Sequence, residues 1–409
     1  MSSHYPPSRL SRRRVLKLLL SSGLGYGLAG CGGSSGDSAQ ARITAVLKAQ
    51  ADAAVASGLV GLTLGEVSHV PGCTVAISGK RRIGGSKAVT PDDRFAIGSN
   101  TKAMTCAAIV GLAQRRGPLL SQTLPQVFAE WASEIHPAFT QVTLIDLLHH
   151  RGGLPPYNGS GPEEDAFLAT VDADTGGQPT TMMGRRAYFA RWLLAQPPAT
   201  GVTPGRDYLY SNAGYVLAAA MIEAQTSRAF EDVFDEVLVK PLGLEGVWRS
   251  PVPGERDVLW GHEGTASALA VVEATAESLA TKDWLDIMAP AGHWACTGAA
   301  YGHWLEWHVR ALRGELTPLP QVYVDDLRAA KGGRYAWGWL GLATPNRVLL
   351  MHTGHEPGFM AEAVMDNKGG FALFGLSNTA YFADDGSSWV LSLIDKALAE
   401  VLKQQSIAL

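Results

Sequence analysis

Segments with the pattern of β-strands lie near both ends of this chain, and the long stretch between them has the pattern of helices. Short apolar runs bounded by Gly, Pro or Asn predict strands at 72–77, 335–342, 348–352, 361–366 and 371–377. Residues 118–290 contain no long β-branched run of this kind. We therefore expect an α/β domain assembled from 41–117 and 291–409, with a mainly α-helical domain, 118–290, inserted between its two parts.

Helical periodicity supports this division of the chain. Amphipathic patterns predict helices at 41–58 and 387–403, next to the expected strands, and a further helix at 100–115. Gly79 and Lys80 suit a turn, and a second short strand is expected after them. Other helices are expected at 143–149, 185–194, 212–224, 230–239 and 303–313.

The first thirty residues have the pattern of an export signal rather than of a folded element. They carry five basic side chains and no acidic one. The apolar run at 18–28 is too short to cross a membrane as a helix, which needs about 20 apolar residues. Paired arginines at Arg12 and Arg13 resemble a twin-arginine signal, so we expect export by that route.

Leu28-Ala29-Gly30-Cys31 resembles a bacterial lipobox, in which the Cys is lipidated on sulfur and becomes the new N-terminus. A Gly/Ser-rich stretch follows, and 31–40 is expected to be a flexible tether. These features predict a signal peptide at 1–30 and a lipoprotein anchored in the membrane through Cys31, facing the periplasm or the cell exterior. The alternative is an ordinary cleaved signal with an incidental Cys.

Charge and residue spacing argue against several other classes of function. The 34 basic and 38 acidic side chains give a net charge of -4, and no basic tract beyond the N-terminus favours nucleic acid as a partner. No helical His-x3-His pair, Cys/His cluster or nucleotide-binding loop is present, so neither a metal nor a cofactor is expected. The sequence leaves open whether Cys73, Cys106 and Cys296 form a disulfide.

Ser99-Asn100-Thr101-Lys102 places a hydroxyl and an amine three residues apart at the start of a predicted helix. Residues at i and i+3 lie on one face of a helix, so the two side chains can meet. A serine hydroxyl becomes a good nucleophile when a neighbouring base takes its proton, and burial can lower the pKa of a lysine until it serves as that base.

Two further motifs occur once each, and in this order after the first. Tyr210-Ser211-Asn212 lies between a turn and a predicted helix, where a phenol can relay a proton and an amide can hold a substrate carbonyl. His352-Thr353-Gly354 ends a predicted strand, and its glycine lets a substrate backbone approach closely.

With these motifs in this order, the chain resembles the serine β-lactamase and penicillin-binding protein superfamily. It is most similar to the branch that contains class C β-lactamases, D-Ala-D-Ala carboxypeptidases and β-lactamase-like esterases. The resemblance covers about residues 45–400 and includes the segments 95–102, 143–155, 208–215, 241–244, 290–292 and 352–359.

The resemblance implies an antiparallel sheet flanked by helices, the β-lactamase/transpeptidase-like fold, with the all-α domain inserted. It also implies that Ser99 forms an acyl-enzyme, while Lys102 and Tyr210 share the proton transfers. Which of these two is the base for acylation stays open. The backbone N–H groups of Ser99 and His355 would form the oxyanion hole, and Asn212, His352, Thr353 and Gly354 would bind substrate.

One departure from the family pattern bears on the substrate. Many β-lactamases carry Lys where this chain has His352, and an ammonium there can meet the carboxylate of a substrate. We therefore expect a hydrolase of a small-molecule ester or amide, with a carboxylesterase first, a β-lactamase second and a D-Ala-D-Ala carboxypeptidase or other D-amino-acid peptidase third. A hypothesis of a different class is a penicillin-binding sensor that is acylated but does not turn over.

Overall fold

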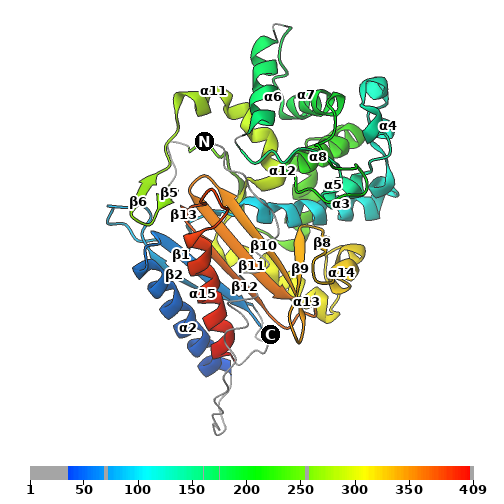
Figure 1. Cartoon of the computed structure of the whole chain (residues 1–409). Coiled ribbons are helices and arrows are strands. Elements are labelled where there is room, and N and C mark those ends of the chain that lie inside the picture. Colours follow the sequence, from blue (N-terminus) through cyan, green and yellow to red (C-terminus); the bar gives the residue numbers. More distant parts are fainter. Residues whose placement is uncertain (1–35, 69–71, 160, 175, 254–257, 406–409) are drawn as a thin grey trace.

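The computed structural model describes residues 36–405 except for 69–71, 160, 175 and 254–257. The predicted export signal and the lipidation site at Cys31 therefore lie outside the described residues. Within the described part, mixed α/β architecture with an antiparallel sheet confirms the predicted fold class (Figure 1). The exact boundaries of the two predicted domains stay a prediction.

A seven-stranded sheet forms one half of the molecule (Figure 1), and all its neighbouring strands run antiparallel. Strands from both ends of the chain meet in its middle, because β1 pairs with β12. In spatial order the strands are β2 (Cys73–Gly79), β1 (Gly61–Val67), β12 (Ala372–Ser377), β11 (Phe359–Asp366), β10 (Val348–Glu356), β9 (Trp339–Ala343) and β8 (Tyr335–Ala336).

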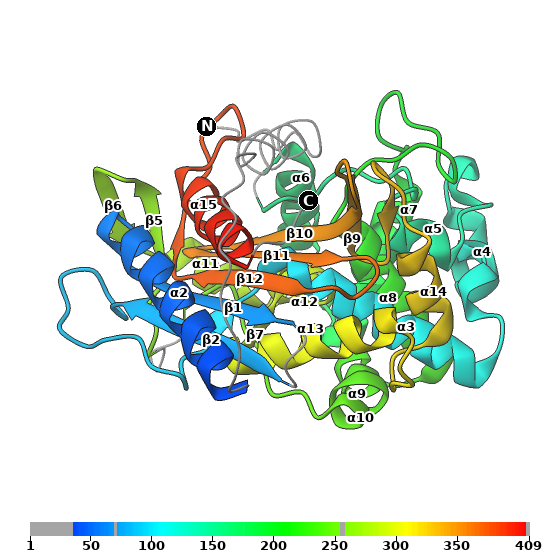
Figure 2. The same ribbon diagram turned by 90° about the horizontal axis from the view of Figure 1, so that it is seen from below.

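Helices cover both faces of this sheet (Figure 2). The helices α2 (Gly36–Ala56) and α15 (Trp389–Gln404) pack side by side on one face, and α13 (Gly298–Arg313) packs on the other. Each face has its own apolar core, and the core on the α13 side continues into the helical half of the molecule. Because β1, β11 and β12 are buried on both faces, they lack the alternating pattern of a half-exposed strand.

The helical half lies beyond α3, which starts beside the sheet (Figure 1). Outside the large sheet, short strands form two three-stranded sheets: β3 (Phe95–Ala96), β7 (Trp294–Cys296) and β4 (Val247–Trp248) in one, and β13 (Thr379–Ala380), β5 (His262–Thr265) and β6 (Ala268–Val271) in the other. The remaining α-helices are α3 (Thr101–Arg116), α4 (Leu124–Val127), α5 (Leu144–Leu148), α6 (Pro162–Ala173), α7 (Met182–Ala195), α8 (Ala213–Thr226), α9 (Phe230–Phe234), α10 (Lys240–Leu242), α11 (Ala276–Leu285), α12 (Ala289–Gly292) and α14 (Gln321–Arg328). The short helices of other types are the 3-10 helices η1 (Gly98–Asn100), η2 (Leu119–Ser121), η3 (Ala129–Glu134), η4 (Pro137–Phe139) and η6 (Asp286–Met288), and the π-helix η5 (Asp235–Val239).

Four local predictions differ from the structure. Helix α2 begins at Gly36, so the end of the predicted tether is helical. The second strand expected after Lys80 is wrong, since Lys80 forms only an isolated bridge with Ala88 and the true partner of β2 is β1, which precedes it. The region predicted as 335–342 is two strands, because Trp337 and Gly338 have positive φ and make a turn between them. Strand β10 runs on to Glu356, so His352 lies inside the strand rather than at its end.

The cysteines of the described residues are free thiols, which answers the question left open by the sequence. Cys106 and Cys296 are buried. Cys73 packs against α13, where an added Cβ on Gly302 would lie 2.1 Å from its sulfur. Glycine at this position lets α13 lie close to the sheet.

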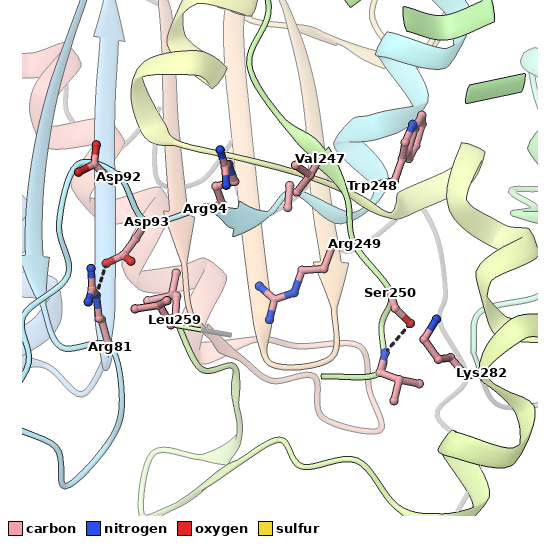
Figure 3. Close-up of a pocket in the computed structure, with 13 residues that line it drawn as sticks. Arg81, Asp92, Asp93, Arg94, Val247, Trp248, Arg249, Ser250, Leu259 and Lys282 are labelled. Atoms are coloured by element: carbon pink, nitrogen blue, oxygen red, sulfur yellow. Dashed lines mark hydrogen bonds and ion pairs between the residues drawn. The ribbon is translucent and has the colours of Figure 1, made fainter. Parts of the chain in front are cut away.

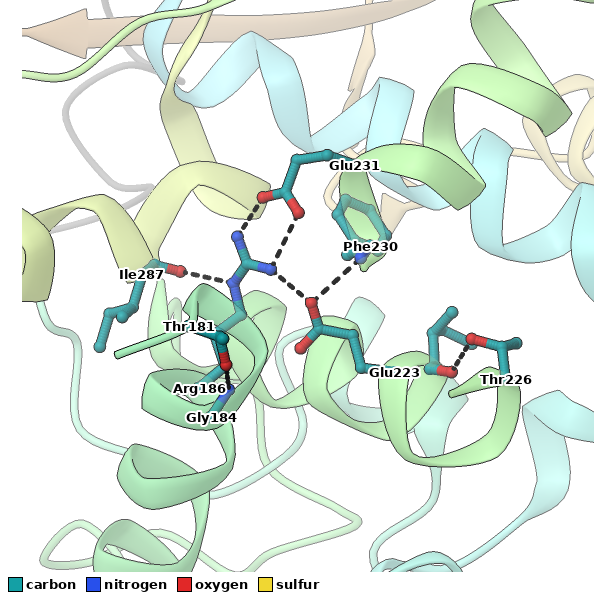
Figure 4. Close-up of polar contacts among 9 residues, drawn as sticks. Thr181, Gly184, Arg186, Glu223, Thr226, Phe230, Glu231 and Ile287 are labelled. Carbon is teal, nitrogen blue, oxygen red and sulfur yellow. Dashed lines mark hydrogen bonds and ion pairs between the residues drawn. The ribbon is translucent and has the colours of Figure 1, made fainter. Parts of the chain in front are cut away.

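A buried arginine ties the helical half together (Figure 4). Arg186 on α7 has no exposed surface, and it donates hydrogen bonds to Glu223 on α8 and to Glu231 on α9. Its Nε also donates to the Ile287 carbonyl at 3.3 Å. Glu223 in turn accepts a hydrogen bond from the backbone N–H of Phe230 at 3.0 Å. Four segments thus meet at one guanidinium, which pairs with the buried carboxylate of Glu223 and the partly exposed carboxylate of Glu231.

Replacing Arg186 should destabilise the protein strongly. Arg186→Ala leaves the Glu223 carboxylate buried without its partner, which costs about 3–5 kcal/mol when a buried pair is broken. Chemical denaturation followed by circular dichroism measures this loss. Arg191→Ala, which removes the exposed pair with Glu134, is the matched control and should have a much smaller effect. Equal effects of the two substitutions would contradict a structural role for the buried network.

Candidate active site

Ser99 and Lys102 meet at the start of α3, as the motif spacing predicts. Ser99 lies in η1, and Lys102 is in the first turn of α3 directly after it. A hydrogen bond of 2.9 Å joins Lys102 Nζ to Ser99 Oγ, and Nζ also donates to the Ala291 carbonyl at 2.7 Å. The amine is therefore held in place from two sides, with its nitrogen next to the serine oxygen.

Burial changes the acidity of this lysine. The Lys102 side chain is fully buried, and this burial lowers its pKa to about 7, although the nearby Glu356 acts in the opposite direction. A substantial fraction of Lys102 is therefore neutral near pH 7. A neutral amine 2.9 Å from Ser99 Oγ can accept the proton of the hydroxyl.

Tyr210 completes the cluster around Ser99. Its phenol forms a hydrogen bond with Ser99, and its ring centroid lies 5.0 Å from Lys102 Nζ. Burial raises the pKa of Tyr210 above its ordinary value, so the phenol keeps its proton at neutral pH. The structure thus brings all three predicted residues together, with the phenol as a proton donor and the amine as the group that titrates near pH 7.

His150 positions Tyr210 and was not predicted as a site residue. Its ring centroid lies 4.2 Å from that of Tyr210, and its Nδ1 accepts the backbone N–H of Ser211 at 3.1 Å. The backbone of His150 has a positive φ of 56°. Burial holds its pKa well below the ordinary value, so the imidazole is neutral. The only signal in the sequence was its place in the family-like segment 143–155.

His352 lies beside this cluster but is not a cation. Its ring centroid is 6.3 Å from that of Tyr210. Burial and, to a lesser degree, the charge of Lys102 lower its pKa to about 3. Nδ1 lies 2.6 Å from the Thr353 carbonyl and Nε2 3.2 Å from the Tyr335 hydroxyl, which fits a neutral ring that donates from Nδ1 and accepts at Nε2. At neutral pH the His352 ring therefore carries no positive charge that could pair with a substrate carboxylate.

Two glycines bring β10 against the backbone of η1. Beyond Met351, β10 leaves β9 and lies against η1 instead. An added Cβ on Gly354 would lie 1.8 Å from the Ile97 carbonyl oxygen, and one on Gly98, which has φ of 53°, would lie 2.3 Å from the His355 nitrogen. Only glycine permits this approach. It places the backbone of His355 next to the segment that carries Ser99, as an oxyanion hole made by both residues requires.

Asn212 and Thr353 are the other predicted substrate contacts, and they lie on α8's N-terminal edge and on β10. Asn212 is the residue before α8, and its Nδ2 donates to the Tyr157 carbonyl at 2.6 Å rather than to Ser99 or Lys102. Its Oδ1 is buried and makes no hydrogen bond within the described part of the chain. Thr353, the residue between His352 and Gly354 on β10, is half-buried.

A buried carboxyl behind Lys102 was missed by the sequence analysis. Glu356 ends β10 and lies 3.5 Å from Nε2 of His293, and an added Cβ on Gly292 would lie 3.0 Å from its carboxyl oxygen. Burial raises the pKa of Glu356 to about 8. The charges of Glu356 and Lys102 influence each other, so they belong to one coupled site. No short motif signals a carboxyl that is brought there by tertiary packing.

The sequence model of the β-lactamase family matches residues 53–394. Unguisins hydrolase ungD' of Aspergillus campestris is 24% identical over 378 residues, which are 81% of this chain and 62% of that protein. The chain thus spans about three fifths of the length of that relative. D-aminopeptidase of Brucella anthropi is 25% identical over 178 residues, which are 44% of this chain and 30% of that protein.

Solved structures show the same fold. D-amino acid amidase from Ochrobactrum anthropi SV3, complexed with L-phenylalanine, superposes with a TM-score of 0.66 over 89% of this chain and 98% of that chain, at 19% identity. SurE superposes with a TM-score of 0.66 over 91% of this chain and 77% of that chain, also at 19% identity. Likeness at this level of identity establishes the fold alone.

The reactivity of Ser99 should follow the titration of Lys102. We expect the rate of covalent labelling by a fluorophosphonate to rise with pH, with a midpoint near 7. Below that pH the amine is protonated and cannot take the serine proton, and above it the amine is neutral. Lys102→Arg should remove the rise together with most of the labelling, because a guanidinium stays protonated.

Tyr210→Phe is the matched control for this profile. It should slow labelling but leave the midpoint near 7, because the phenol does not titrate in this range. A wild-type midpoint near the ordinary value for lysine would contradict a neutral amine in the folded protein. The disappearance of the midpoint in Tyr210→Phe would also contradict the assignment of this titration to Lys102.

Proposed function

The chain belongs to the β-lactamase family, and we propose that it is a serine hydrolase that cleaves an amide or ester through an acyl-enzyme on Ser99. The observation that carries this proposal is the hydrogen-bonded cluster of Ser99, Lys102 and Tyr210 with an amine whose pKa is about 7. Such a cluster supplies a nucleophile, a base and a proton donor in one place.

In the proposed acylation step, Ser99 Oγ attacks the substrate carbonyl carbon and its proton passes to Lys102 Nζ. The carbonyl oxygen becomes negatively charged and is stabilised by the backbone N–H groups of Ser99 and His355. The bond from carbon to the leaving nitrogen or oxygen then breaks, and the leaving group takes a proton from the Tyr210 hydroxyl, which regains one from Lys102. A water molecule reverses these transfers and releases the acid.

The site around Ser99 favours a substrate that carries no negative charge next to His352. A neutral imidazole there gives a carboxylate no ionic partner, which argues against the binding mode that a lysine would provide. D-aminopeptidase and D-amino acid amidase are named for amide-type substrates. We therefore place amides, with D-amino-acid amides among them, ahead of esters and β-lactams.

We further propose export and a lipid anchor, on the sequence features of residues 1–31. Within the described part of the chain no helix has the length and apolar character that crossing a membrane requires. The proposal of membrane attachment rests on the lipobox-like segment that ends at Cys31.

Substrate class and turnover can be tested in one panel. The wild-type protein should turn over a D-amino-acid p-nitroanilide repeatedly, a p-nitrophenyl ester more slowly and nitrocefin least, whereas Ser99→Ala should lose all three activities. The formation of product in a single stoichiometric burst would instead support the penicillin-binding sensor. Retained hydrolysis or labelling in Ser99→Ala would overturn the assignment of the nucleophile.

The same panel run with His352→Lys tests the argument about charge. Lysine at this position should raise the rate on nitrocefin, which bears a carboxylate, relative to the rates on the p-nitroanilide and the p-nitrophenyl ester, which bear none. His352→Gln is the neutral control and should leave the order of substrates unchanged. An unchanged order in His352→Lys would remove the charge of this residue as a determinant of specificity.

Cys31→Ser should release the protein from the membrane fraction of a bacterial expression host. The expected reason is that the serine oxygen is not lipidated, so that the acyl anchor is lost. Fractionation and immunoblotting measure the distribution, with Cys106→Ser as the matched control that should stay with the membrane. Persistent membrane association of Cys31→Ser would contradict the lipobox.

A further inference from the structure

A buried carboxyl lies behind the lysine of the site and has no part in the proposed proton transfers. Glu356 is the last residue of β10, and its side chain is buried. One carboxyl oxygen lies 3.5 Å from Nε2 of His293, and an added Cβ on Gly292 would lie 3.0 Å from the same oxygen. Because burying a carboxyl costs free energy, apolar packing alone does not explain a glutamate at this position.

One short segment contacts both this carboxyl and the lysine. The carbonyl of Ala291 accepts a hydrogen bond from Lys102 Nζ at 2.7 Å. The next two residues along the chain, Gly292 and His293, are the ones that lie against Glu356. A change in the charge of the carboxyl can therefore be felt by the amine, since the two groups share this buried segment.

Three charged side chains influence Glu356 within the described part of the chain. Burial has the largest effect and raises its pKa to about 8. Arg249, which follows β4 in the chain (Figure 3), and Lys102 both favour the ionised carboxylate, whereas Asp286 in η6 opposes it. Glu356 thus gains its negative charge close to the pH at which Lys102 loses its positive charge.

The other titratable groups beside these two keep one charge state near pH 7. Lys282 on α11 lies 2.5 Å from Asp286 and forms an ion pair with it. The titratable side chains that border Lys102 or Glu356 and stay uncharged because they are buried are Cys106, His150, Tyr210, Tyr215, His293 and His352.

We propose that Glu356 is a positioning residue of the site: held against the segment 291–293, its carboxyl determines how tightly Lys102 holds a proton. An ionised carboxylate favours the ammonium form of Lys102, whereas a protonated carboxyl does not. Glu356 thus makes the amine a stronger base for the proton of Ser99 than burial alone would leave it. This inference rests on the proposed function, because it concerns the same base.

Glu356→Gln tests the proposal, because it removes the ionisable group and keeps the size of the side chain. We expect the midpoint of fluorophosphonate labelling at Ser99 to fall from near 7 by about half a pH unit, since the attraction for the ammonium is lost. Loss of packing would act in the opposite direction, because water that reaches Lys102 would raise its pKa toward the ordinary value of a lysine. The direction of the shift therefore separates an effect of charge from an effect of structure.

Glu362→Gln is the matched control. Glu362 is a buried carboxyl on β11, the strand next to β10, and the charge that acts on it is that of Asp395 rather than that of Lys102. Its replacement should leave the labelling midpoint near 7. An unchanged midpoint in Glu356→Gln, a higher midpoint, or an equal shift in the two variants would overturn the proposal.

A direct titration of the amine distinguishes failure of this proposal from failure of the proposed function. In protein labelled with ¹³C-lysine, the ¹³Cε resonance that is absent from Lys102→Arg reports the protonation of Lys102 without any reaction at Ser99. Its midpoint should be lower in Glu356→Gln than in the wild type. A lower midpoint in protein that is not labelled at Ser99 would support the effect of Glu356 and contradict the proposed function. Labelling at Ser99 with equal ¹³C midpoints in the two proteins would overturn the role of Glu356.

Discussion

The candidate site depends on the removal of one amine from water. A lysine in solvent is protonated at neutral pH and cannot take a proton from serine. Complete burial of Lys102 removes this obstacle by lowering its pKa to about 7, while hydrogen bonds to Ser99 Oγ and the Ala291 carbonyl keep the nitrogen in place. Burial without such partners would cost stability with no gain in function. The segments packed around Lys102 form the enclosure that makes this burial possible.

That enclosure is built from segments that are far apart in the chain. The helix α3 supplies the lysine, α12 supplies the carbonyl that accepts from it, and β10 closes the side next to η1. Glycine is also required where the turn between β8 and β9 touches α3, because an added Cβ on Gly338 would lie 2.4 Å from the backbone of Ala103. The pairing of β1 with β12 unites both chain ends in the sheet that holds β10. Contacts between segments that are distant in the chain thus hold the reacting groups in place.

The sequence predicted what is local and missed what depends on packing. Ser99, Lys102 and Tyr210 could be found because their spacing and flanking turns are local features, and the structure does bring them together. Strand β1 was missed because its Gly61-Leu62-Thr63-Leu64-Gly65-Glu66-Val67 is interrupted by glycines and is buried on both faces, which removes the alternating pattern. An added Cβ on Gly65 would lie 2.0 Å from the ring of Phe374, a contact more than 300 positions away that no local pattern encodes. Glu356 escaped notice for the same reason.

Burial also determines which charges the site holds before reaction. His150, His352 and His293 all have lowered pKa values because burial disfavours their charged forms, so these three imidazoles are neutral at pH 7. A negative charge that develops on a substrate carbonyl oxygen then meets backbone N–H groups rather than a fixed imidazolium. Transfer of the Ser99 proton to Lys102 creates a positive charge at the same moment and only a few ångströms away. Burial disfavours each of these charges by itself, and the mutual attraction of the two charges together with the backbone N–H groups at the oxyanion offsets that cost.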